Sequence, residues 1–164
     1  MLSVLFAYSF GFVEFFISTW AFGDFKRKFQ LPAFLIFWPF AFFGLLIRVI
    51  ARLYLKAGYK LDPEDKKKEL VKTGIYSMER HPGYVGYFMY SVSIQMIVQN
   101  YITAIIMTLV LWKNFMNRVI REEEALYKIF GKEYLEYAKV VKTNIPFMND
   151  IAKVSLGISH SDKE

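Results

Sequence analysis

Cysteine is absent from the 164 residues of this chain, and histidine occurs only twice, at His81 and His160. The lack of cysteine excludes disulfide bonds and cysteine-ligated metals, and two histidines are too few for a metal site built from histidine. Hydrophobic residues, by contrast, make up 55% of the chain, and aromatic residues make up 19%. This composition is too apolar for an ordinary soluble domain and favours a protein that lies in a lipid bilayer.

The net charge of +6 is compatible in principle with nucleic acid or with an anionic membrane as a partner. The lysines and arginines flank apolar runs, which is the distribution expected beside lipid headgroups. We therefore expect contact with membrane lipid and none with nucleic acid.

Four apolar stretches predict membrane helices, at Leu2–Trp20, Leu31–Ile50, Tyr84–Val98 and Tyr101–Met116. The first two hold about the 20 residues that a bilayer requires. We expect a short loop over 23–30 between them and a kink at Pro39 in the second. The last two are shorter and only Gln99 and Asn100 separate them, which predicts a tight antiparallel hairpin.

Glu14 lies inside the first of these stretches, where a carboxylate is costly in lipid. Such a residue has either a function or a structural hydrogen-bonded position, and the sequence leaves the role of Glu14 open between the two.

The charged segment Arg118–Val141 follows a helical period. On a helical wheel one side carries Val119, Ala125, Leu126, Ile129 and Phe130, and the opposite side carries Arg121, Glu124 and Lys128. Arg118 and Glu122, one turn apart, fall on the apolar side. A charged pair aimed at the interior is expensive unless it is paired or binds a charged ligand, so this pair is either a structural ion pair or part of a site.

These patterns together predict an all-α, multi-span membrane protein of about four membrane helices, with a cytoplasmic helix over 118–141. Residues 1–149 are expected to form a single domain, followed by a polar tail over 150–164. Because most Lys and Arg residues follow the second stretch and the hairpin, those regions are expected to face the cytoplasm.

Several short motifs follow one another in the second half of the chain. They are Gly74-Ile75-Tyr76, Arg80-His81-Pro82 with Tyr84 and Gly86, Arg118 with Glu122-Glu123, Phe130-Gly131 with Tyr134 and Tyr137, and Ile145-Pro146-Phe147. In order and spacing, over about 70–147, this series resembles the isoprenylcysteine carboxyl methyltransferases, integral membrane enzymes of the endoplasmic reticulum. The resemblance implies transfer of a methyl group from S-adenosylmethionine to the carboxylate of a prenylated C-terminal cysteine in processed CaaX proteins, the small GTPases among them.

The count of Lys and Arg residues places the expected site on the cytoplasmic side of the membrane. The roles of single residues are what the resemblance implies, carried over by position. Arg118 would face the substrate carboxylate, and Arg118 and Glu122 would be the catalytic residues. The residues implied to contact the cofactor are Lys68, Glu69, Leu70, Val71, Tyr76, His81, Pro82, Gly83, Tyr84 and Glu122. No metal is implied.

Two other functions remain open from the sequence. A methyltransferase acting on phospholipids or other amphiphiles would use the same donor, but its amine acceptor would not favour Arg118 nearby. A non-catalytic membrane protein would bind no cofactor and would tolerate apolar replacements of Arg118 and Glu122. The preference between farnesyl and geranylgeranyl groups, the natural protein substrates and the oligomeric state are not determined by the sequence.

Overall fold

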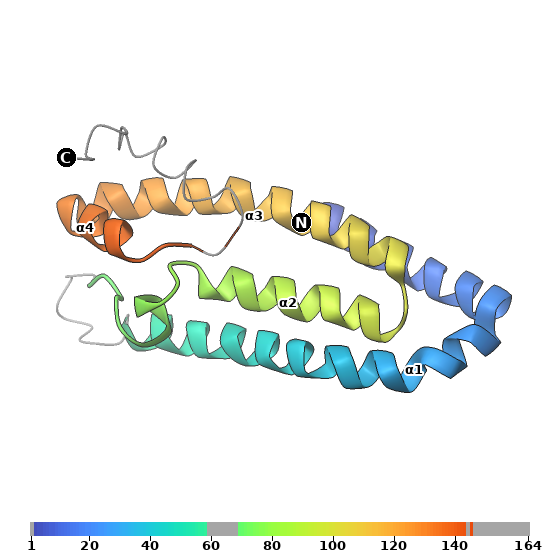
Figure 1. Cartoon of the computed structure of the whole chain (residues 1–164). Coiled ribbons are helices and arrows are strands. Elements are labelled where there is room, and N and C mark those ends of the chain that lie inside the picture. The colour runs from blue at the N-terminus through green and yellow to red at the C-terminus, as the bar shows by residue number, and fades with distance from the viewer. Residues whose placement is uncertain (1, 59–68, 144, 146–164) are drawn as a thin grey trace, which may run out of the picture. The chain divides into compact units, whose positions relative to one another are not determined.

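A computed structural model describes residues 2–58, 69–143 and 145 of the chain, and in this part every regular element is a helix (Figure 1). The elements are α1 (Leu2–Gly58), the short 3₁₀ helix η1 (Gly74–Ser77), α2 (Pro82–Ile97), α3 (Tyr101–Phe130) and α4 (Lys132–Val140). The predicted all-α class is therefore confirmed. The polar tail over 150–164, with His160, and Lys68 lie outside the described residues.

The first two predicted membrane stretches belong to the single helix α1. Its one break in helical backbone geometry is at Phe22 (φ −131°, ψ 30°), where Figure 1 shows the helix turning sharply. The prediction of a loop over 23–30 is wrong, because those residues are helical. The predicted kink at Pro39 is also wrong, since the backbone angles there remain helical and the chain bends at Phe22 instead.

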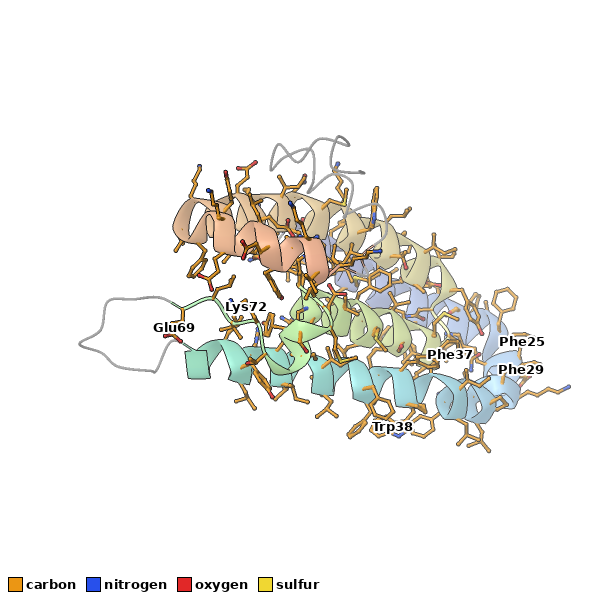
Figure 2. The ribbon with its side chains drawn as sticks, turned by 60° about the vertical axis from the view of Figure 1, so that its left-hand side comes forward. Phe25, Phe29, Phe37, Trp38, Glu69 and Lys72 are labelled. Carbon is orange, nitrogen blue, oxygen red and sulfur yellow. The ribbon has the colours of Figure 1, made fainter. Side chains whose placement is uncertain are left out.

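Among the described residues α1 is also the one helix long and apolar enough to cross a membrane by length and composition. Its most apolar window of 18 residues has a mean hydropathy of 2.2, and only 17% of that window is buried. Figure 2 shows Phe25, Phe29 and Trp38 projecting from this helix, and all three are at least 40% exposed. An outward face of large apolar side chains is what lipid requires.

The chain forms two compact units, each built from parts of α1, α2 and α3. The first comprises Met1–Ile47 and Gly86–Asn114 and contains the α2–α3 hairpin, which is present as predicted. In this unit the buried positions of α1 are alanines and glycines, apart from Lys26. A Cβ at Gly44 would lie 2.6 Å from the backbone N of Tyr90 and 2.7 Å from the carbonyl of Gly86, so two helix backbones are in direct contact.

Polar side chains attach the turn of this hairpin to α1. The Glu14 carboxylate accepts from the backbone N–H groups of Ile102 (3.1 Å) and Thr103 (2.7 Å), the first turn of α3. Lys26 donates to the carbonyl of Val98 at the end of α2 (3.2 Å). Both contacts satisfy helix-end groups that would otherwise be unpaired. Glu14 therefore has a structural position as a cap on another helix.

The second unit comprises Arg48–Val85 and Phe115–Glu164. Here the predicted helix over 118–141 has the wrong start, although its end agrees with Val140, the last residue of α4. α3 continues without interruption from the fourth predicted stretch to Phe130, and Gly131 (φ 54°) separates it from α4. The positive φ favours glycine, and the change of direction lets α4 bury Tyr134 and Tyr137.

Candidate functional site

The wall of the candidate site begins with the segment that precedes α2. Pro82 is the first residue of α2, a position where its missing N–H is no loss. The backbone N–H of His81 donates to the carboxylate of Glu79 (3.1 Å), and the carbonyl of His81 accepts from Tyr84 (3.0 Å). Arg80 and His81 are thereby directed into the unit, where each is less than 10% exposed.

Glu123 of α3 receives both of these side chains. Nη1 of Arg80 lies 3.0 Å from one carboxylate oxygen of Glu123 and 3.1 Å from the other. Nε2 of His81 lies 3.0 Å from the first oxygen. The Glu123 side chain is 0% exposed and that of Arg80 is 4% exposed, so this is a buried ion pair whose charges are compensated within the protein.

A second, more accessible polar group lies at the start of α2. The hydroxyl of Tyr84 donates to the carboxylate of Glu122, and Nδ1 of His81 lies 3.8 Å from the other oxygen of Glu122. The positive charges of Arg118 and Arg48 act on the Tyr84 hydroxyl, and Arg48 also donates to the carbonyl of Gly83 (3.4 Å). The Glu122 side chain is 47% exposed, so a ligand can reach it.

A cavity lies in the same unit, and its walls are the end of α1, the segment that precedes α2, and the helices α3 and α4. Figure 2 shows Glu69 on the segment that follows the undescribed residues. The cavity is lined by Leu55, Glu69, Leu70, Val71, Tyr76, Arg80, Leu126, Phe130, Tyr134 and Tyr137. Aromatic rings with a few charged groups are a common lining of small-molecule sites.

Hydrogen bonds connect two tyrosines of the cavity, Tyr76 and Tyr137, and the ring of Tyr134 lies 6.1 Å from that of Tyr137. The hydroxyl of Tyr137 donates to the carbonyl of Tyr76 (2.6 Å), and the hydroxyl of Tyr76 donates to the carbonyl of Ala51 in α1 (3.2 Å). Burial raises the pKa of Tyr134, and the negative charge of Glu123 raises it further. Burial likewise raises the pKa of Tyr137, against a smaller opposing effect of Arg80. Both hydroxyls are therefore neutral at physiological pH.

The residues singled out from the sequence fall into two groups. Glu69, Leu70, Val71 and Tyr76 line the cavity. His81, Pro82, Gly83 and Tyr84 lie at the start of α2, where His81 and Tyr84 face Glu122. Arg118 is exposed and lies one helical turn before Glu122. Lys68 is outside the described residues.

The helical wheel of α3 misplaced its buried face. Arg118, Glu122, Ala125 and Ile129 are exposed, whereas the buried or half-buried positions are Val119, Glu123, Leu126 and Phe130. Arg121, Glu124 and Lys128 are exposed, as predicted. Hydropathy alone predicts that a glutamate lies at the surface. Glu123 is buried because its pairing with Arg80 and His81 offsets the free-energy cost of removing the carboxylate from water.

Sequence reasoning also omitted residues that now belong to the site. Arg80 and Glu123 each stand beside a predicted site residue, and Tyr134 and Tyr137 belong to a motif for which the sequence predicts no role in the site. The signal for Tyr134 and Tyr137 was their spacing of three residues, which puts both rings on one face of α4.

Known proteins resemble this chain in sequence and in structure. The sequence model of the isoprenylcysteine carboxyl methyltransferase (ICMT) family matches residues 37–128. A protein-S-isoprenylcysteine O-methyltransferase of Xenopus laevis is 34% identical over 142 residues, covering 85% of this chain and 49% of the relative. That of Saccharomyces cerevisiae is 43% identical over 79 residues, covering 48% of this chain and 33% of the relative.

A solved structure of the eukaryotic intramembrane Ras methyltransferase ICMT is similar with a TM-score of 0.79 and 31% sequence identity. The similarity covers 88% of this chain and 52% of that one. The chain therefore spans about half the length, or less, of these three relatives.

Proposed function

Because the chain belongs to the isoprenylcysteine carboxyl methyltransferase family, we propose that it transfers a methyl group from S-adenosylmethionine to the carboxylate of a prenylated C-terminal cysteine. The observation that carries the proposal is the juxtaposition, within one unit, of an aromatic cavity and a cluster of accessible charged groups on α2 and α3. The names of the relatives support the same acceptor.

The lining of the cavity suits the methyl donor. S-adenosylmethionine supplies a methyl group on a positively charged sulfur, next to an amino-acid group and an adenosine. The rings of Tyr76, Tyr134 and Tyr137 offer π faces to a base or a cation, and Glu69 offers a negative charge to an ammonium group. Leu70, Val71 and Phe130 would exclude water from the apolar parts of the donor.

The charged groups outside the cavity suit the acceptor. A C-terminal carboxylate is ionised near neutral pH, so the reaction requires alignment and partial desolvation and no general base. The guanidinium of Arg118 is exposed and can hold a carboxylate with two parallel hydrogen bonds. Tyr84 restrains Glu122, which lies one helical turn from Arg118. There Glu122 would contact the donor while Arg118 holds the acceptor, so that the two reactants lie side by side.

The acceptors on this proposal are prenylated CaaX proteins, with small GTPases as the expected class, and the prenyl chain would remain in the lipid. The protein would reside in the endoplasmic reticulum membrane with the site facing the cytoplasm, which agrees with the basic residues around α2 and α3.

Methyl transfer in membranes containing the chain tests the proposal. Radiolabelled S-adenosylmethionine is offered with N-acetyl-S-farnesylcysteine, and the base-labile methyl ester is counted. The native chain should form the ester, and Arg118→Ala and Glu122→Ala should lose most of it. Arg121→Ala is the matched control, because Arg121 lies on the same helix and is exposed, and it should retain activity.

Two outcomes would contradict the proposal. If the native chain binds the donor but methylates lipid amines in place of the farnesylcysteine, the acceptor is wrong. If it binds no donor, the chain is not a methyltransferase on its own.

A further inference from the structure

We propose that Glu123 is a positioning residue, which holds Arg80 at the wall of the cavity and His81 beside Glu122 without itself touching donor or acceptor. The inference rests on the proposed function, because it assigns the cavity to the methyl donor. It concerns a residue that neither the helical wheel nor the resemblance had placed in the site.

Glu123 meets the first requirement of such a role, which is complete burial with fixed partners. Its side chain is 0% exposed, and both of its oxygens lie within 3.1 Å of Nη1 of Arg80. One of them also lies 3.0 Å from Nε2 of His81. A carboxylate without contact to solvent is retained only when charged or hydrogen-bonding partners compensate it, so the three side chains hold one another in place.

The partners of Glu123 face different parts of the site. Arg80 lines the cavity together with Tyr76 and Tyr134. His81 presents its other ring nitrogen, Nδ1, to Glu122 at 3.8 Å. The carboxylate of Glu123 therefore fixes the position of Arg80 at the donor cavity and the position of His81 beside Glu122.

The hydrogen bond to Glu123 also determines the ring orientation of His81. An ionised carboxylate only accepts hydrogen bonds, so Nε2 of His81 must carry a proton. This directs Nδ1 toward Glu122. Removing the acceptor at Glu123 would release the ring, although no group that contacts donor or acceptor had been changed.

The test compares three adjacent glutamates by isosteric replacement. Glu123→Gln keeps the shape of the side chain but turns one acceptor into an N–H donor, which opposes the N–H groups of Arg80 or His81. We expect donor affinity, measured by isothermal titration, and kcat/KM each to fall by about tenfold or more. Glu124→Gln is the matched control and should match the native chain, because Glu124 is exposed.

Glu122→Gln separates positioning from contact. It should lower kcat/KM while leaving the hydrogen bond between His81 and Glu123 intact. Circular dichroism of each variant checks that the helices persist, and Glu123→Asp, which keeps the charge on a shorter side chain, should recover part of the lost donor affinity. The proposal is overturned if Glu123→Gln is folded and stays within about twofold of the native chain in both quantities.

A double-mutant cycle with Arg80→Met tests whether Glu123 acts through Arg80. We expect Glu123→Gln to cost donor affinity much less in the Arg80→Met background than in the native one. Equal losses in the two backgrounds would refute action through Arg80.

A measurement on His81 keeps this proposal independent of the proposed activity. The chain has two histidines, so ¹⁵N-histidine labelling with His160→Ala leaves a single imidazole to observe. We expect the Nε2 proton of His81 to exchange slowly with water in the native chain and rapidly in Glu123→Gln. Unchanged exchange in Glu123→Gln would refute the positioning role even if methyl transfer is established, and faster exchange in that variant would support it even if the chain methylates another acceptor or none.

Discussion

The carboxylate of Glu14 accepts two hydrogen bonds from Thr103, one from the backbone N–H at 2.7 Å and one from the hydroxyl at 2.6 Å. The two residues are 89 positions apart, and Thr103 lies in the first turn of α3. A side chain of α1 thus caps the N-terminus of another helix, where negative charge is favourable.

Removing this cap should destabilise the protein. We expect Glu14→Ala to lower the free energy of unfolding by about 1–3 kcal/mol, since two N–H groups and a hydroxyl lose their acceptor in a water-poor setting. Thermal unfolding in detergent, followed by circular dichroism, measures the loss. Asp24→Asn is the control, because Asp24 is an exposed acid of the same helix. An equal effect of the two substitutions would show that Glu14 is no cap.

Packing at Gly44 should be equally sensitive. A methyl group there would lie within 2.7 Å of two backbone atoms, which cannot rotate away, so α1 and α2 would have to separate. We expect Gly44→Ala to cost about 1–3 kcal/mol of unfolding free energy. Gly23→Ala, with no atom within 4 Å of the added carbon, should be neutral or slightly stabilising in the same denaturation experiment. A neutral Gly44→Ala would contradict the direct backbone contact.

The hydroxyl of Tyr137 should matter to both stability and donor binding, because it donates to the carbonyl of Tyr76 in the cavity wall at 2.6 Å. For Tyr137→Phe we expect about 0.5–1.5 kcal/mol lower stability and weaker binding of S-adenosylmethionine in a titration. Tyr127→Phe, which alters a tyrosine that is 39% exposed, serves as the control. If donor affinity is unchanged in Tyr137→Phe, the hydrogen bond between Tyr137 and Tyr76 does not contribute to the donor site.

Alkaline pH should destabilise the protein through its buried tyrosines. Burial raises the pKa of Tyr134 and Tyr137 in the folded state, whereas tyrosine in an unfolded chain ionises near pH 10. Above that pH the unfolded chain loses protons that the folded chain retains, so stability is full below about pH 10 and falls as pH rises further.

Unfolding temperatures measured from pH 7 to pH 11 check this expectation. The variant Tyr134→Phe/Tyr137→Phe should lose less stability than the native chain between pH 10 and pH 11. Tyr127→Phe should follow the native curve. If the native chain and the double variant decline in parallel, the two hydroxyls are not the groups responsible.

The sequence by itself determined the helical membrane class and the segments that carry the site. Long apolar runs favour helices in lipid, because each backbone polar group must be satisfied within its own segment. The α2–α3 hairpin followed from two residues between two apolar runs, and Tyr76, His81 and Glu122 stood out because charged and aromatic residues are concentrated in a few short motifs.

Tertiary structure decided which of the charged residues are buried. The helical wheel placed Arg118 and Glu122 inside, whereas the structure buries Glu123, because the cost of burying a carboxylate depends on partners 42 and 43 residues away. The cap at Glu14 likewise depends on a contact with a distant segment. Periodicity and hydropathy describe only the local preference of a segment. They do not indicate which distant residue will become its partner when the chain folds.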